Sequence, residues 1–521
     1  MKKRGVIAAG HEETAKAAQI ILEEGGNAFD AVLGALCAAC TAEPVLASLG
    51  GGGFLLAHPA GGGGKNVLYD FFTHTPRQRR ALDEVDFFPI MADFGEAQQE
   101  FHIGLGSMAT PGVVKGLFGA HKDLGSMPMA KIVEPAVKLA NQGAVINRLQ
   151  DYIFTVVEKI YISNEISLKV YGDPARPGKL VREGDRLAFP AFADTLDSLA
   201  REGEDLFYRG EIAATIASDC QQGGGFLSRG DFESYQLKRR NPLELSYGEA
   251  KILTNPPPST GGILIAFALE LLKESGLARE KFGSANHLQQ LASAMMLTNE
   301  ARVESNLHQS LGEDGGNSLL DPGFVEMYRT RVHGHPHARR GTTHISVIDA
   351  DGNAAALTLS NGEGAAYIAP GTGIMINNML GEEDINPHGF NQWPADIRMC
   401  SMMAPSLIQY PNGEIMALGS GGSNRIRTAI LQVILNLIDF KMPLTEAVQS
   451  PRIHFENGLL SIETGFEEAA LSSLQEQIGK IKQWSGQNLF FGGVHAVRFD
   501  PSSGHIEGVG DSRRGGVAVE V

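Results

Sequence analysis

The junction between Gly341 and Thr342 is where residue types and spacing point most directly to chemistry. A segment rich in arginine and histidine, residues 329–340, leads to Gly341, and Thr342 opens a run that predicts a strand. If the peptide bond between Gly341 and Thr342 is cut, Thr342 carries both a hydroxyl nucleophile and a free α-amino group. Such an amino group has a pKa of about 7.7–8.0, which suits a general base at neutral pH. Taken alone, these residues are also typical of an ordinary strand start.

A second group that could take part in chemistry is Gly421, Gly422 and Ser423. Glycines allow two backbone N–H groups to converge on one point, and the apolar stripe over 424–440 predicts a helix that starts directly afterwards. The positive end of a helix dipole favours a developing negative charge. Residues 421–423 could therefore stabilise an oxyanion, although the same pattern also fits a plain turn before a helix.

The elements that must hold these residues are predicted by hydrophobic patterning. Hairpins are expected over 343–360 and 406–418, each with a turn rich in Asp, Asn or Gly. The first part of the chain predicts helices over 14–24 and 28–41 and then a glycine-rich strand from Leu49. Strands gathered in sheets with helices outside them predict a layered α+β fold.

The remaining segments predict supporting structure. Residues 107–320 are expected to be mainly helical, and residues 329–340, which lack apolar periodicity, to form an exposed, mobile linker. Cys37 and Cys40 lie three residues apart on one predicted helix face, where core packing explains them. The sequence contains no zinc motif or dinucleotide fingerprint in its expected context, so we expect no metal and no cofactor.

The residues around Thr342 resemble those around the nucleophile of the γ-glutamyltranspeptidase family of N-terminal nucleophile hydrolases. The resemblance at this point is carried by residues 342–347, 351–353 and 358–360. Further landmarks of the family follow in family order at residues 8–11, 50–54, 111–112, 134–136, 207–210, 256–262, 370–374, 377–378, 403–405, 419–426, 451–452 and 511–514. The resemblance therefore covers essentially the whole chain.

This resemblance implies a four-layer αββα sandwich that cuts itself before Thr342. The large fragment, residues 1–341, and the small fragment, residues 342–521, would stay together as one globular domain. Thr342 would attack an amide carbonyl, form an acyl-enzyme and pass the acyl group to water or to an amine. The resemblance gives Ser360 the role of tuning the nucleophile and gives Gly421, Gly422 and Ser423 that of the oxyanion loop.

The resemblance also implies which residues bind the substrate, and here the sequence departs from the family. Asn361 and Glu382 (or Glu383) match residues that hold the α-amino group of the substrate, and Ser401 matches one of two carboxylate-binding serines. Met402 replaces the second serine, and Phe72 stands where the family has an arginine that clamps the α-carboxylate. A guanidinium binds a carboxylate far better than a neutral side chain does. The acyl-transfer residues are therefore expected to be intact and the substrate-binding residues altered.

Composition limits the partners and the location. The 60 acidic against 44 basic residues give a net charge of −16, which argues against nucleic acid or an anionic membrane as a main partner. Four cysteines are too few for a disulfide framework, and the longest apolar run, residues 31–40, is about half of the ~20 residues that span a bilayer. We expect a cytoplasmic protein, and a homo-oligomer stays open.

Three functions remain in competition. The first is a γ-glutamyltransferase and glutathione hydrolase that acts on γ-glutamyl amides such as glutathione. The second keeps this chemistry but acts on another acyl amide, as the glutaryl- and cephalosporin-type acylases of the family do, and Phe72 and Met402 favour it. The third is a non-enzymatic binding protein that never cleaves. The joint presence of Thr342, Ser360 and the two glycines argues against the third.

Overall fold

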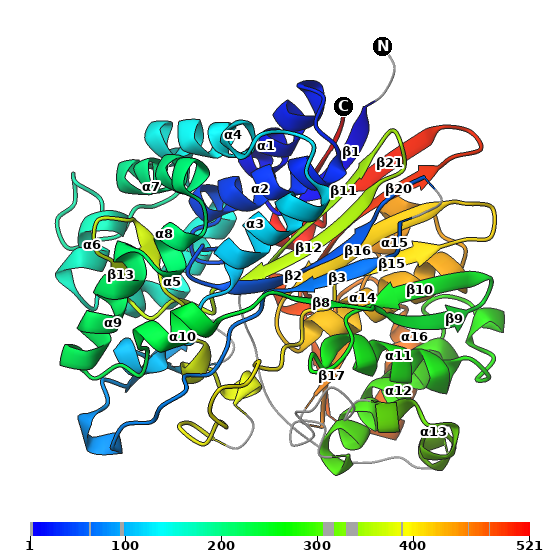
Figure 1. The fold of residues 1–521 in the computed structure, drawn as a ribbon. Helices are drawn as coiled ribbons and strands as arrows, with labels where there is room; N and C mark the ends of the chain where they lie inside the picture. Colours follow the sequence, from blue (N-terminus) through cyan, green and yellow to red (C-terminus); the bar gives the residue numbers. More distant parts are fainter. Residues whose placement is uncertain are drawn as a thin grey trace.

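The computed structural model describes residues 4–61, 64–93, 98–305, 317–329, 342–386, 389–456, 458–478 and 480–521. Two antiparallel sheets form its centre (Figure 1). The first sheet has seven strands in the order β22 (Val517–Glu520), β1 (Gly5–Ala9), β11 (Thr343–Asp349), β12 (Ala354–Ser360), β2 (Gly52–His58), β3 (Val67–Asp70) and β8 (Lys238–Arg240). The predicted hairpin over 343–360 is thus β11 and β12, at the middle of this sheet.

The second sheet has six strands drawn from distant parts of the chain. Their order is β21 (His505–Val509), β20 (Gly493–Asp500), β16 (Ile415–Gly421), β15 (Ser406–Gln409), β10 (Ala250–Thr254) and β9 (Leu243–Tyr247). Strands β11 and β12 of the first sheet contact β16, and β11 also contacts β20, so the two sheets pack against each other. The predicted hairpin over 406–418 corresponds to β15 and β16.

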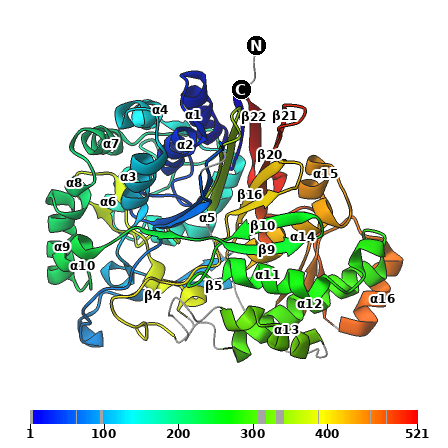
Figure 2. The same ribbon diagram turned by 45° about the vertical axis from the view of Figure 1, so that its right-hand side comes forward.

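Helices cover the face of each sheet that points away from the other sheet (Figure 2). The helices on the side of the first sheet are α1 (Glu12–Glu23), α2 (Ala28–Ala42), α3 (Val113–Leu124), α4 (Met129–Gln142), α5 (Arg148–Tyr161), α6 (Glu165–Tyr171), α7 (Pro190–Glu202), α8 (Asp205–Tyr208), α9 (Glu211–Gly223) and α10 (Arg229–Ser234). Those on the side of the second sheet are α11 (Gly261–Leu272), α12 (Ala285–Glu304), α13 (Pro322–Arg329), α14 (Arg425–Ile438), α15 (Leu444–Gln449) and α16 (Glu468–Ile478).

Short strands complete the outer parts of the molecule. They pair as β4 (Phe88–Asp93) with β5 (Gln98–Ile103), β6 (Ala144–Val145) with β7 (Arg186–Leu187), β13 (Ile368–Ala369) with β14 (Ile374–Met375), and β17 (Ile453–Glu456) with β18 (Leu459–Ile462) and β19 (Ile481–Gln483). No helix in the described ranges has both the length and the apolar character that a membrane crossing requires.

The alternation of side chains along β11 assigns its residues to two different cores. Ile345 and Val347 belong to the core that the first sheet shares with α1 and α2. His344 points the other way, since a Cβ on Gly419 of β16 would come within 2.3 Å of its ring. Successive residues of a strand point to opposite faces. Thr342 precedes His344 by two positions, so it belongs to the same face, the one that looks toward the second sheet.

The mixed α+β class expected from the sequence is confirmed, together with the two N-terminal helices. Residues 107–320 are mainly helical, as expected, and this segment also supplies β6, β7, β8, β9 and β10. Strands β9 and β10 are five residues each, and β10 pairs with β15, which lies much further along the chain. Of the predicted linker, Arg329 ends α13, and residues 330–340 lie outside the described residues.

Candidate active site

Thr342 lies at the start of the central hairpin, buried between the two sheets. The β11–β12 register pairs Thr343 with Leu359, so one further step places Thr342 opposite Ser360, the last residue of β12. Thr342 is only 4% exposed, and its carbonyl oxygen accepts a hydrogen bond of 3.1 Å from Nη1 of Arg514. The predicted nucleophile, Thr342, and its predicted partner, Ser360, therefore lie opposite each other at the same end of the two central strands.

The predicted oxyanion loop approaches Thr342 from the second sheet. Strand β16 ends at Gly421, where a Cβ would lie 1.9 Å from the carbonyl oxygen of Thr342, so no side chain can be accommodated there. Gly422 and Ser423 have φ values of +122° and +53°, and α14 begins at Arg425. The turn therefore directs the chain from strand to helix beside Thr342, and the positive end of the α14 dipole lies at this point.

The end of β12 brings together two of the predicted substrate-binding residues. Ser360 Oγ accepts a hydrogen bond of 3.1 Å from the N–H of Gly362, and a Cβ on Gly362 would meet Glu382 Oε1 at 2.3 Å. Asn361 is fully buried, and within the described part of the chain neither atom of its side-chain amide has a hydrogen-bond partner. A buried, unpaired amide costs stability unless another group satisfies it.

Ser401, the third predicted substrate-binding residue, is held by a different segment. Its carbonyl oxygen accepts hydrogen bonds of 2.8 Å from Ser259 Oγ and from the N–H of Thr260, and its own Oγ accepts one of 3.1 Å from the N–H of Met403. These contacts fix Ser401 next to the start of α11. They do not join it to Thr342 or to Asn361.

Phe72, predicted to stand in place of a carboxylate-binding arginine, packs its ring into the core between the sheets. Phe72 stacks on Phe54 with ring centroids 5.5 Å apart, and a Cβ on Gly52, the strand partner of Ser360, would meet the Phe72 ring at 3.0 Å. A buried arginine, Arg398, lies behind this ring. It donates to the carbonyl oxygen of Phe72 and pairs with the Asp70 carboxylate at 3.4 Å.

Arg77, Arg79 and Arg80 do not replace the missing arginine. Arg77 pairs with Asp396 at 3.4 Å, Arg79 lies over the ring of Trp393, and Arg80 donates to the carbonyl oxygen of Gln221. Each of these guanidinium groups is therefore engaged with the loop around residues 391–396 or with α9. That Phe72 replaces the arginine of the family stays a prediction from the sequence.

Sequence reasoning misses a pair of charged residues on either side of Thr342. The Glu43 carboxylate accepts hydrogen bonds of 2.6 Å from Thr343 Oγ1 and 2.8 Å from Thr14 Oγ1. Arg514 donates to the carbonyl oxygen of Thr342, and burial lowers the pKa of its guanidinium to about 10. In the sequence, residues 511–514 are recognisable only as a landmark of the family. Nothing in the sequence indicates a role for Glu43 except that it follows a predicted buried helix.

A neutral histidine, His344, packs between the sheets two residues after Thr342, on the same face of β11. His344 Nδ1 lies 2.8 Å from Thr358 Oγ1, and its Nε2 lies 2.9 Å from Ser346 Oγ. Burial, together with the nearby His495, lowers the pKa of His344 well below its ordinary value. His344 is therefore uncharged at neutral pH and links β11 to β12 through the hydroxyl of Thr358.

The structure gives two further results on the predicted site. In the described ranges, no group of three or more His, Cys, Asp or Glu side chains could hold a metal ion. The four cysteines are buried, and none of them forms a disulfide. Gly341, the other half of the predicted cleavage site, lies outside the described residues.

Comparison with known proteins assigns a family to this arrangement. The arrangement consists of two stacked sheets that place the buried Thr342 against a glycine turn. A profile of the γ-glutamyltranspeptidase family matches residues 14–521, and the chain belongs to this family. The glutathione hydrolase proenzyme of Escherichia coli (strain K12) is 29% identical over 553 aligned positions, which cover 98% of this chain and 90% of that protein.

Other relatives carry a different activity in their names. The Acylase ACY 1 proenzyme of Pseudomonas sp. (strain SE83) is also 29% identical, over 99% of this chain and 94% of that protein. The crystal structure of cephalosporin acylase from Bacillus halodurans has a TM-score of 0.84 at 22% identity and covers 99% of this chain and 96% of that chain. This last likeness shows the shared fold, and the two relatives above differ in name, one a glutathione hydrolase and the other an acylase.

Proposed function

We propose that this protein is a self-processing amidohydrolase and acyltransferase whose nucleophile is Thr342. The leading candidates for its substrate are γ-glutamyl amides such as glutathione. The observation that carries the proposal is the place of Thr342, buried at the start of β11 and in contact with Gly421. The family supports it, since the relatives named above are proenzymes.

Self-cleavage at Thr342 requires one intramolecular transfer and one water molecule. Thr342 Oγ attacks the carbonyl carbon of Gly341, the C–N bond between the two residues breaks, and an ester forms. The hydroxyl proton ends on the released α-amino group. Water then hydrolyses the ester, so that residues 1–341 gain a terminal carboxyl group and Thr342 regains its hydroxyl.

The processed site carries out the same chemistry on an amide substrate. The free α-amino group of Thr342 takes the proton from its own hydroxyl as Oγ attacks the acyl carbon, and it returns the proton to the leaving amine. Backbone N–H groups of residues 421–423 and the start of α14 stabilise the oxyanion. Ser360, opposite Thr342, orients the nucleophile. Water or an acceptor amine then removes the acyl group.

Substrate binding is proposed for the residues at the end of β12. Asn361 has a buried amide without a partner in the described ranges, and the carboxylate of Glu382 lies beside Gly362. A charged α-amino group of a γ-glutamyl substrate would donate to the amide oxygen of Asn361 and to the carboxylate of Glu382. Ser401 would contact the α-carboxylate.

A second candidate is an acylase for another dicarboxylic or apolar acyl amide. It is favoured by Phe72, whose ring packs against Gly52 where an arginine would bind a carboxylate, and by Met402, which packs with the apolar residues of α11. An apolar wall accepts an acyl chain without a charged α-carboxylate more readily than a γ-glutamyl group.

Hydrolysis of a γ-glutamyl anilide beside a glutaryl anilide tests the proposal. We expect the purified, processed protein to hydrolyse the γ-glutamyl anilide, and mass spectrometry of quenched reactions to place the acyl group on the peptide that begins at Thr342. Hydrolysis of the glutaryl anilide alone would replace the first candidate with the acylase. If a protein that is cut at Thr342 hydrolyses neither anilide, both the γ-glutamyl and the glutaryl group are excluded as its acyl group.

Three further expectations, on the layering, the fragments and the location, remain proposals. The order of helices, sheet, sheet and helices supports the four-layer αββα sandwich of this hydrolase class. The two fragments would remain one globular domain, because β1 and β11 are neighbours in one sheet although they fall on opposite sides of the cut. A cytoplasmic location is proposed from the sequence alone.

A further inference from the structure

We propose that Glu43 and Arg514 form a charged clamp that positions Thr342 through the peptide unit that joins it to Thr343. The inference rests on the proposed function, since it concerns the same nucleophile. Arg514 Nη1 donates to the carbonyl oxygen of this peptide unit at 3.1 Å, and Glu43 Oε2 accepts from the hydroxyl of Thr343 at 2.6 Å. The two contacts come from opposite ends of the chain.

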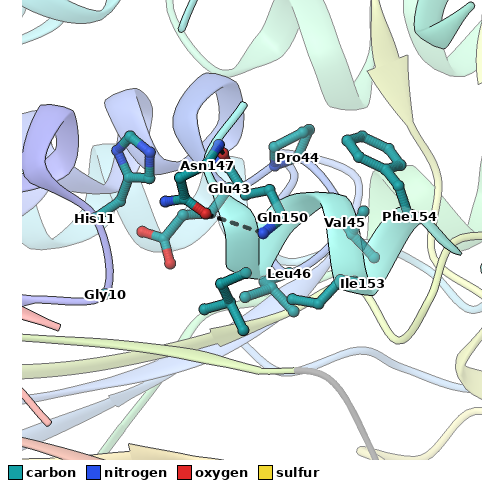
Figure 3. A pocket seen from close by; sticks show the side chains of 11 residues that line it. Gly10, His11, Glu43, Pro44, Val45, Leu46, Asn147, Gln150, Ile153 and Phe154 are labelled. Carbon is teal, nitrogen blue, oxygen red and sulfur yellow. Dashed lines mark hydrogen bonds between the residues drawn. The ribbon is translucent and has the colours of Figure 1, made fainter. Parts of the chain in front are cut away.

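The position of Glu43 is fixed by contacts other than the one with Thr343. It follows α2 as its C-cap residue, and its other oxygen accepts a hydrogen bond of 2.8 Å from Thr14 on α1. Figure 3 shows its carboxylate beside Gly10, where a Cβ would lie 2.6 Å from Oε2. The glycine therefore leaves the space that the carboxylate occupies. At 4% exposure, Glu43 is a buried acceptor held by two hydroxyl donors.

Arg514 supplies the opposite charge from the other side of β11. It follows β21 in η8 (Ser512–Arg514), is 7% exposed, and lies close to the backbone of Gly421 and Gly422. Burial lowers the pKa of its guanidinium, while the carboxylates of Asp511 and Glu43 act in the opposite direction. Glu43 and Arg514 therefore act on each other, while Glu43 holds the side chain of Thr343 and Arg514 holds the carbonyl oxygen of Thr342.

The clamp is expected to act on Thr342 both before and after the chain has been cut. Before cleavage, covalent bonds hold Thr342 on both sides, and the clamp restrains the position of its hydroxyl. Afterwards it is a chain terminus, and terminal residues fray unless other contacts hold them. The clamp acts on the C-terminal side of Thr342 and leaves its α-amino group and hydroxyl available. A misplacement of about 1 Å at a reacting group can cost about 100-fold in rate, so this restraint has consequences for catalysis.

Two isosteric substitutions distinguish an effect on the position of Thr342 from an effect on the stability of the whole protein. Thr343→Val and Thr14→Val each remove one hydroxyl donor from the same buried carboxylate, but only Thr343 is bonded to Thr342. We expect the two variants to lose similar stability in urea unfolding. We expect Thr343→Val to slow the first-order self-cleavage rate by roughly 10- to 100-fold, and Thr14→Val to slow it at least about fivefold less. Thr343→Ser, which keeps the donor, should restore the rate.

A second readout uses the processed enzyme with a γ-glutamyl anilide as the probe. Thr343→Val is expected to lower kcat by a similar factor with KM within about twofold of the wild type, because the clamp acts on the nucleophile and not on bound substrate. Equal slowing by Thr14→Val and Thr343→Val would overturn the clamp, since the effect would then follow from destabilising Glu43.

The outcomes also separate this inference from the function on which it rests. If the wild-type chain is never cut at Thr342, the proposed function fails and the clamp fails with it. If the wild type is cut and Thr343→Val is cut at the wild-type rate, only the clamp is wrong. For the hydrolysis readout, Glu43→Gln keeps one acceptor but removes the charge, and a wild-type kcat in this variant would also contradict the clamp.

Discussion

The carbonyl oxygen of Thr342 connects three separate parts of the chain. It accepts a hydrogen bond from Arg514, it belongs to the peptide unit that precedes Thr343, and it lies where a Cβ of residue 421 would be. The atoms around this carbonyl oxygen are in close contact, so there is no unfilled space beside it. Substitutions that add or remove a few atoms should therefore have large and specific effects.

The first prediction concerns the space at Gly421. In Gly421→Ala the new Cβ would lie 1.9 Å from the Thr342 carbonyl oxygen, so strand β16 or Thr342 must move. We expect self-cleavage to slow by roughly 100-fold or more, measured on gels of freshly synthesised protein. Gly486→Ala is the matched control, because a Cβ there meets nothing within 4 Å. Equal cleavage by both variants would contradict the close approach.

The second prediction concerns the unpaired amide of Asn361. Asn361→Ala removes a buried polar group that lacks a partner in the described ranges, so the loss of stability should be under about 1 kcal/mol or even reversed. If Asn361 binds substrate, KM for a γ-glutamyl anilide should rise roughly tenfold with kcat less affected. Steady-state kinetics and urea unfolding of the same preparation give both values. An unchanged KM would remove Asn361 from the binding site.

The sequence predicts residues at this scale only where a motif is continuous. Thr342 is recognisable from its neighbours, and residues 421–423 are recognisable because two glycines precede a helix. Glu43 is not, because its partner Thr343 lies 300 positions away, and the Arg514 contact spans 172 positions. No local pattern encodes a hydrogen bond between two buried groups so far apart.

At the scale of elements, local pairing can be predicted and distant pairing cannot. The hairpin of β11 and β12 has a turn and alternation in one short stretch, and its observed limits agree with the expected range. Strands β9 and β10 have a clear register with each other, but β10 needs β15 beside it to become part of a larger sheet. Their place in the second sheet therefore depends on tertiary structure.

The third prediction tests how the two sheets meet. The ring of His344 on β11 fills the space over Gly419 on β16, where a Cβ would come within 2.3 Å. We expect Gly419→Ala to lower the free energy of unfolding by about 1–3 kcal/mol through overpacking. In a His344→Ala background the same change should cost clearly less, because the ring is gone. A double-mutant cycle measures this coupling, and additive effects would contradict the contact.

At the scale of the whole molecule, buried histidines link stability to pH. Burial lowers the pKa of His287, His454 and His495 to about 4 and that of His344 well below its ordinary value. The unfolded chain binds protons at these residues near pH 6.5, while the folded protein does not. Their contribution to stability is therefore complete above about pH 6.5 and is lost as the pH falls toward 4.

The fourth prediction follows from this difference in proton binding. The free energy of unfolding should fall by about 1.4 kcal/mol per pH unit for each such histidine between pH 6.5 and about 4. Urea unfolding at a series of pH values measures the slope. His287→Gln should make the slope shallower, because it removes one of the buried histidines whose pKa is lowered. A flat profile between pH 6.5 and 5 would contradict the prediction.

The central claim is that Thr342 is the nucleophile that cuts the chain, and one measurement tests it directly. Wild-type protein and Thr342→Ala are purified side by side and analysed by intact mass and by N-terminal sequencing. The account predicts two fragments in the wild type, residues 1–341 and a smaller one that begins at Thr342, and a single chain in the variant. A wild-type protein that stays uncut, or a variant that is cut at the same bond, would contradict it.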